Sequence, residues 1–319
     1  KRPEGVDVNV TEIVQIGEPV EHRGVVVYPL FPRRDPLAEY LTLDEALPRG
    51  LRIREVDEAG SVPELVVENP LEERVLLYDG EELLGAKQNR ILNVSVLVEA
   101  ASSLCIPVSC VEQGRWSRRS ERFEAAPYVS PGGLRRRKAE AQAARPLARG
   151  IAQGEVWDAV HAKAMRMSVD SPTGASADVY RAYERDLRAL EDAFPAEPGQ
   201  CGAILGLGDE LCLDLVSRPD AFARLWPKLR AGYLLDALER LGREPTGPAE
   251  LDAFVAAIER ARATRQPSAG LGEDVRLSGD GVIGSGLELD GEPIQLSAFT
   301  SRDGGRRAFG RIARPSRRA

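Results

Sequence analysis

The sequence predicts an α+β protein: a β-rich core, built as a sandwich or a bent antiparallel sheet, with two helical insertions packed on it. Three observations support this prediction. Short apolar runs bounded by turn residues recur through the first 116 residues, apolar residues at helical spacing occupy most of 134–194 and 219–262, and strand-like runs return at 200–216 and 273–299. Blocks of strands followed by blocks of helices are typical of the α+β class.

Residues 1–116 form the predicted β-rich core. Thr42 is a favourable N-cap residue and predicts a short helix over 43–47. Asn69 and Pro70 separate two strand-like runs, a pattern that predicts a hairpin. The predicted strands of this segment, in chain order, are residues 25–30, 51–56, 64–68, 74–78, 91–98 and 104–111.

Residues 117–199 are predicted to be a loop followed by a helical insertion. Arg, Ser, Pro and Gly dominate 117–133, so a mobile loop is expected there. Helices are predicted over 134–147, 152–166 and 177–194. The last of these has a single apolar face, formed by Tyr180, Tyr183, Leu187, Leu190 and Phe194.

Residues 200–272 are predicted to form a hairpin followed by helices. The hairpin joins 200–206 to 211–216 across Gly208 and Asp209. Residues 273–301 are then expected to supply C-terminal strands that complete the core, and residues 302–319 to form a disordered basic tail. The helices expected here are 219–225, 228–241 and 249–262, and the strands are 273–277, 282–289 and 293–299.

Composition places the chain in the cytoplasm. A hydrophobic content of 43% and a charged content of 29% are ordinary for a soluble domain. The sequence contains no apolar run of about 18 residues, the length that a membrane helix needs, and its first residues lack the apolar stretch of a secretion signal. The four cysteines form no CxxC pair, so we expect free thiols in a reducing compartment and no membrane partner.

Charge and histidine content restrict the chemistry. The net charge of −7 makes nucleic acid an improbable partner, although the basic segments 115–122 and 135–138 could meet a small anion. His22 and His161 are the only histidines, and no nucleophile-elbow motif accompanies either. The sequence therefore predicts neither a multi-histidine metal site nor a Ser-His-Asp triad, and it indicates no particular cofactor.

One polar cluster between apolar runs is the candidate site. It lies in 80–90 and 107–116, where polar side chains crowd against segments expected to be buried. Such groups cost free energy unless they are paired, so the cluster is either a binding site or a structural hydrogen-bond network. Cationic and amide groups suit a ligand that carries phosphate, carboxylate or ribose hydroxyls. The candidate ligand-binding residues are Lys87, Gln88, Asn89, Arg90, Arg115 and Trp116.

Three residues of this cluster are candidates for acid–base or nucleophilic chemistry. If the strand extends to residue 112, Cys110 and Glu112 share a face, so they could serve as nucleophile and base. Glu81 and Glu82 must point to opposite faces of a strand, and Glu82 is chosen as the catalytic candidate. Glu112 with Lys87 or Arg90 is equally compatible with a structural salt bridge.

Two long motifs, residues 78–90 and 106–116, resemble the bacterial domain family named for its association with ADP-ribosylglycohydrolase and rhodanese-phosphatase proteins. Shorter likenesses occur at 171–175, 200–203 and 294–299, so the resemblance covers most of 25–299. It implies a link to ADP-ribose or nucleotide metabolism by association alone, and it assigns no catalytic residue.

The leading functional hypothesis is the binding, with hydrolysis or transfer as a further step, of a nucleotide-like or ADP-ribose-like anionic ligand. Lys87 and Arg90 would hold the anion, and Glu112 would be the acid–base group. The alternative is a non-enzymatic interaction or scaffold module with a protein partner, in which the cluster is a structural network. Residues 171–176 could contact phosphate, but they suit a helix N-cap better.

Overall fold

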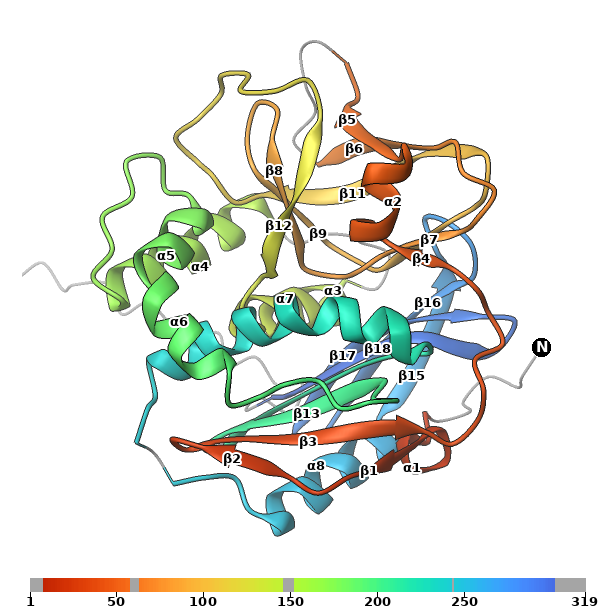
Figure 1. Ribbon diagram of the computed structural model, residues 1–319, viewed down its shortest axis with the longest axis vertical. Coiled ribbons are helices and arrows are strands. Elements are labelled where there is room, and N and C mark those ends of the chain that lie inside the picture. The colour runs from red at the N-terminus through yellow and green to blue at the C-terminus, as the bar shows by residue number, and fades with distance from the viewer. Residues whose placement is uncertain (1–7, 58–62, 146–151, 243, 302–319) are drawn as a thin grey trace, which may run out of the picture.

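The computed structural model describes residues 8–57, 63–145, 152–242 and 244–301. Its strands form a large sheet in one half of the molecule and a curled sheet system in the other, and helices lie between the halves and at one side (Figure 1). This arrangement confirms the predicted α+β class with a β-rich core. The predicted tail lies outside the described residues.

The large sheet joins the start of the described chain to its end. Its strands run in the order β1-β3-β13-β14-β18-β17-β16-β15, with β2 paired to β3, and all the pairings are antiparallel. Strands β3 and β13 are adjacent although more than 160 residues separate them. The nine strands are β1 (Val14–Ile16), β2 (Val20–His22), β3 (Val25–Pro32), β13 (Gly202–Leu207), β14 (Glu210–Val216), β15 (Arg262–Pro267), β16 (Glu273–Gly279), β17 (Val282–Leu289) and β18 (Glu292–Thr300).

The second half consists of two smaller sheets around their own apolar core. A six-stranded sheet has the order β12-β8-β9-β11-β6-β5, and a three-stranded sheet has the order β10-β7-β4. Residues such as Ile53, Leu65, Leu83 and Ile106 fill the space between them. Their strands are β4 (Leu41–Thr42), β5 (Arg52–Glu55), β6 (Glu64–Asn69), β7 (Val75–Leu77), β8 (Glu81–Gly85), β9 (Arg90–Leu92), β10 (Val96–Val98), β11 (Ser102–Cys110) and β12 (Phe123–Val129).

Two helices fill the layer between the halves. Helix α7 contacts β12 on one side and β13 and β14 on the other, and α3 contacts β16, β17 and β18 (Figure 1). Helix α8 covers the opposite face of the large sheet, against β16 and β17. The helices are α1 (Val10–Ile13), α2 (Leu43–Arg49), α3 (Gly132–Ala144), α4 (Gln153–Arg166), α5 (Ser176–Ala182), α6 (Glu184–Glu191), α7 (Pro219–Leu238) and α8 (Pro248–Arg260).

A buried polar network connects the two halves through α3. Arg135 donates two hydrogen bonds of 2.7 Å to the carboxylate of Asp214 on β14, and a third, of 2.8 Å, to Ser297 on β18. The hydroxyl of Tyr78, at the end of β7, donates to the same carboxylate at 2.5 Å, and that of Tyr233 on α7 also donates to it. All five side chains are at most 1% exposed.

One pairing and one strand predicted for the N-terminal half are wrong. The expected hairpin between 64–68 and 74–78 does not form, because β6 pairs with β5 and β11 whereas β7 pairs with β4 and β10. β6 alternates between buried and less buried residues, whereas every residue of β7 is buried, so the two strands suit different sheets. The expected strand 91–98 is likewise divided into β9 and β10.

Three predicted element boundaries are also wrong. The expected loop 117–133 contains β12, whose buried Phe123 and Tyr128 belong to two different apolar cores. The expected helix 177–194 is interrupted at Tyr183, between α5 and α6. Conversely, α7 continues through Pro227, where the sequence indicated two helices.

Two further observations concern membrane-spanning helices and disulfides. No helix in the described part is long and apolar enough to cross a membrane. All four cysteines, Cys105, Cys110, Cys201 and Cys212, are free.

Candidate functional site

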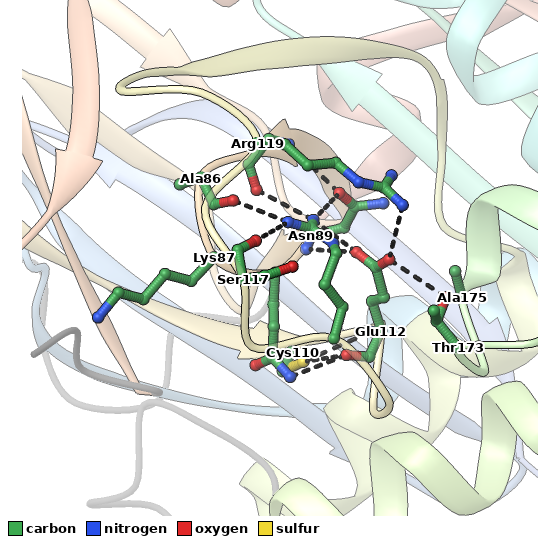
Figure 2. A network of polar contacts seen from close by, with 12 residues as sticks. Ala86, Lys87, Asn89, Cys110, Glu112, Ser117, Arg119, Thr173 and Ala175 are labelled. Atoms are coloured by element: carbon green, nitrogen blue, oxygen red, sulfur yellow. Dashed lines mark hydrogen bonds and ion pairs between the residues drawn. The ribbon is translucent and has the colours of Figure 1, made fainter.

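Glu112 lies at the centre of the predicted cluster. β11 ends at Cys110, so Glu112 belongs to the turn that follows, and it forms an isolated bridge with Ala175. Its carboxylate accepts hydrogen bonds from Arg115 Nη2 at 2.6 Å, from Asn89 N at 3.2 Å and from Thr173 Oγ1 at 3.2 Å (Figure 2). Burial alone would raise the pKa of Glu112, but these donors outweigh it and lower the pKa below its ordinary value. Glu112 is thus held as an anion, which makes it a poor general acid or base.

Arg115 is the internal partner of Glu112. The side chain is 4% exposed, and its two Nη atoms donate to five acceptors: the Glu112 carboxylate, the Asn89 side chain and three backbone carbonyls. Those carbonyls belong to Gly85, Ala86 and Ser117, so the guanidinium fastens the loop after β11 to the turn after β8. This saturation leaves Arg115 little capacity to hold a ligand.

The three residues that follow Lys87 are also buried and internally bonded. Gln88 donates to the Glu112 carbonyl at 2.9 Å and accepts from Arg90 Nη1 at 3.1 Å. Asn89 Oδ1 accepts from Gly85 N at 3.2 Å and from Arg115 at 3.1 Å. Arg90 is completely buried, 3.9 Å from Glu55, and burial lowers its pKa. The structure therefore brings Gln88, Asn89 and Arg90 together with Glu112 as a network.

Cys110 shares this network without approaching the Glu112 carboxylate. Its Sγ lies 3.4 Å from both the backbone nitrogen and the carbonyl oxygen of Glu112. The side-chain amide of Gln153 accepts a hydrogen bond from the Cys110 N–H and donates one to the Cys110 carbonyl. Burial raises the pKa of the Cys110 thiol. A protonated, buried thiol is a weak nucleophile. The shared strand face predicted for Cys110 and Glu112 is wrong, because the strand ends between them.

Lys87 and Trp116 lie apart from the carboxylate. Figure 2 shows the Lys87 side chain pointing away from Glu112 and Arg119. The Lys87 ammonium is 5.4 Å from the centre of the Trp116 ring, and Trp116 is 49% exposed. These two residues form a surface cation–π contact.

Glu82 is the most unusual carboxyl group of the region. It is fully buried on β8, and neither of its oxygens has a hydrogen-bond partner of good geometry within the described residues. Burial raises the pKa of Glu82 to about 8, although the nearby Ser176 and Tyr128 hydroxyls lower it. Glu81 faces the other way and pairs with Lys228 at 2.9 Å, as the strand parity predicts. Glu82 is thus mostly protonated at neutral pH.

An open cleft adjoins the network. It has a volume of about 460 Å³ and lies between the 119–124 segment and residues 172–181. Glu112 and Asn89 form part of its floor, and the exposed guanidiniums of Arg119 and Arg181 line it. Arg119 is 3.9 Å from Glu112, and Arg181 is 2.6 Å from Asp178. Two cations and several acceptors therefore surround one space.

Sequence reasoning missed Arg119, Thr173, Asp178 and Arg181. Arg119 lies in the basic segment 115–122, and Thr173 lies in the segment 171–176, whose sequence is compatible with a phosphate contact. The bridge between Glu112 and Ala175 brings that segment to the site, and no local pattern could have indicated this pairing. Helix α5 then begins at Ser176, close to the N-cap position that was expected.

The fold and the site define an α+β protein with a polar cleft beside the curled sheet. A family model, described as the ARG and Rhodanese-Phosphatase-superfamily-associated Protein domain, matches residues 13–299, and the chain belongs to this family. No curated protein and no solved structure is similar to it at a significant level.

The described residues contain no group of three or more His, Cys, Asp or Glu side chains placed to hold a metal ion.

Proposed function

We propose that the cleft binds a small anionic ligand of the nucleotide or ADP-ribose class. The observation that supports this proposal best is the pair of exposed arginines, Arg119 and Arg181, which are 62% and 71% exposed and line the same space. Guanidinium groups bind phosphate with paired hydrogen bonds. The net charge of −7 disfavours an extended nucleic acid in comparison with a small anion.

The carboxylates of the cleft suit the hydroxyl groups of such a ligand. Glu112 is fixed as an anion by Arg115, and Asp178 and Glu124 line the same space. A carboxylate that remains ionised can accept hydrogen bonds from ribose hydroxyls. In this proposal Glu112 orients the ligand, and the buried network behind it keeps the carboxylate in place.

A hydrolysis or transfer step would require a proton donor beside the ligand. The pKa values of two buried glutamates are shifted in opposite directions: that of Glu82 is raised, whereas that of Glu112, which lines the cleft, is lowered. Such a division is typical of acid–base pairs. Glu82, however, is completely buried. We therefore propose ligand binding as the function, and Glu82 is the candidate acid for a hydrolysis or transfer step.

The test is a titration of the protein with ADP-ribose, NAD and ADP by calorimetry and thermal shift. Arg119→Gln and Arg181→Gln should each weaken binding by about tenfold, since each removes a charged hydrogen bond. The matched control is Arg188→Gln, an exposed arginine of α6 that pairs with Glu184, and it should leave affinity unchanged. Absence of any shift with millimolar ligand, or wild-type affinity in both cleft variants, would refute the proposal.

A second candidate function is an interaction module with a protein partner. It is favoured by the burial of the network, since Gln88, Asn89, Arg90, Glu112 and Arg115 are all at most 5% exposed and bonded to one another. In that case the exposed Trp116 with Lys87 would be the natural contact surface. We place either function in the cytoplasm, because the four cysteines are free.

A further inference from the structure

A second cavity lies on the other side of α5 from the cleft. Its volume is about 190 Å³, and α3, α4, α5 and α7 supply its walls. Ser176 lines this cavity, whereas its neighbours Ala175 and Ala177 line the cleft. The two spaces are therefore separated by the start of α5 and need not share a ligand.

One wall of the second cavity is apolar. Leu134 of α3, Val160 of α4 and Leu235 of α7 contribute to it, and Val160 and Leu134 belong to a small apolar core together with Ile91 and Val111. A volume of 190 Å³ is below the roughly 300–1,000 Å³ of common drug-sized sites. This space fits a compact ligand and is too small for a dinucleotide.

The polar lining of the cavity is strongly cationic. Five cationic side chains and two carboxylates line it. Both carboxylates are already engaged, because Asp236 accepts from Lys163 at 2.5 Å and from the backbone N–H of Gly133 at 2.9 Å, and Glu239 accepts from Arg166 at 2.6 Å. The acidic groups are thus neutralised within the lining, and a surplus of positive charge remains.

Three arginines make up the remaining positive charge of the lining, and carboxylates outside the lining offset part of it. Arg136 and Arg240 share a single carboxylate, Glu210, at 3.4 Å and 2.5 Å; Arg136 also lies 3.9 Å from Glu140. Arg137 is exposed and makes no ion pair with any described residue. Several planar guanidiniums around one small opening match the oxygens of a phosphate group.

We propose that this cavity is a second anion site, separate from the cleft, and that it takes a small organic phosphate. The phosphate group contacts Arg136, Arg137 and Arg240, and the apolar part of the ligand packs against Leu134, Val160 and Leu235. The cavity's own features support this site, so it does not depend on what the cleft binds.

The test uses phenyl phosphate as the probe and the full chain in calorimetric titrations at low and high salt. Arg137→Gln should weaken binding by roughly fivefold or more, because it removes one charged contact from the phosphate. Ala159→Phe, which places a ring in the cavity, should abolish binding. Affinity should fall as salt rises, because exposed charge contacts are screened.

Controls separate this site from the cleft and from general charge effects. Arg119→Gln, in the cleft, and Arg188→Gln, on α6, should bind phenyl phosphate as the wild type does. Benzamide, a neutral ring, should bind more weakly than phenyl phosphate. Wild-type affinity in Arg137→Gln, or loss of affinity in Arg119→Gln with none in Arg137→Gln, would overturn the proposal. Arg137 is exposed, so its variant remains informative if Ala159→Phe does not fold.

Discussion

At the scale of single residues, two glutamates that are both nearly inaccessible to solvent have opposite affinities for a proton. Glu112 is surrounded by donors, and Arg115 contributes a 2.6 Å contact. Glu82, on β8, has no such donor in good geometry. Burial penalises the charged form of both, so the hydrogen bonds decide the outcome. Each glutamate therefore leads to its own prediction.

Glu112→Gln should destabilise the fold. The substitution leaves Arg115 buried without its carboxylate, and removal of one partner of a buried pair costs about 3 kcal/mol. Urea denaturation measures this loss. Glu124→Gln, at an exposed carboxylate of the same cleft, is the control and should change stability by less than about 0.5 kcal/mol. Equal stability of Glu112→Gln and wild type would mean that the network does not support the fold.

Glu82→Gln should remove a pH dependence from the stability. The folded pKa of Glu82 is raised to about 8 from an ordinary value of 4.5, so between these values the folded state retains a proton that the unfolded state releases. The stability that this retained proton contributes to the folded state is fully present below about pH 4.5 and is lost as the pH rises to about 8. Relative to Glu82→Gln, the wild type should therefore lose roughly 1.4 kcal/mol per pH unit in this window.

The measurement is a series of denaturant titrations at pH 5, 6.5 and 8 on both proteins. Taking the difference between them cancels the titration of other groups. Parallel curves for the two proteins would show that Glu82 is ionised in the folded state or is hydrated.

At the scale of elements, the sequence predicted those whose pattern is local. The hairpin of β13 and β14, the strands β16 to β18 and the helix α2 after Thr42 follow from apolar runs, turn residues and capping. The Glu45 carboxylate accepts hydrogen bonds from the backbone N–H and from the hydroxyl of Thr42, both at 2.9 Å, at the start of this helix.

The elements that sequence reasoning missed depend on distant partners. Strand β15 (Arg262–Pro267) consists mostly of polar residues, so its sequence does not predict a strand. Its pairing with β16 makes it one. β12 lacks a clear alternation because Pro127 and two alanines interrupt its apolar residues. The candidate site shows the same limit. The motif residues 88–90 do lie together with Glu112 and Arg115, but the cleft beside them depends on the 171–181 segment, which reaches it through tertiary pairing.

At the scale of the whole molecule, the ion pair of Arg135 with Asp214 is one of several buried ion pairs that hold the two halves together. Arg135 comes from α3, Asp214 from the large sheet and Tyr78 from the start of the turn before β8. Gly80 in that turn has φ +86°, and a Cβ there would lie 2.8 Å from Arg135 Cδ, so the turn also makes room for the arginine. The halves should consequently unfold as one unit.

Arg135→Met should lower the stability of the whole protein by about 4 kcal/mol, because Asp214 then remains buried without a cation. Thermal unfolding followed by calorimetry measures the change. Arg137→Gln, two residues along the same helix but exposed, should have almost no effect. The double variant Arg135→Met with Asp214→Leu should recover part of the loss, since no isolated charge remains. A change below about 1 kcal/mol for Arg135→Met would show that the bridge is dispensable.

The pairing of β3 with β13 has a consequence for folding during synthesis on the ribosome. The strongly apolar strand Val25–Pro32 emerges early, but its partner Gly202–Leu207 is made about 170 residues later, after roughly ten seconds or more of synthesis. The segment from 41 to 129 contains both members of each of its own pairs, so it can fold in that interval. Strands β1 and β2 can pair with one edge of β3 early, but the edge that later receives β13 stays unpaired beside a folded neighbour, a situation in which chaperone protection matters most.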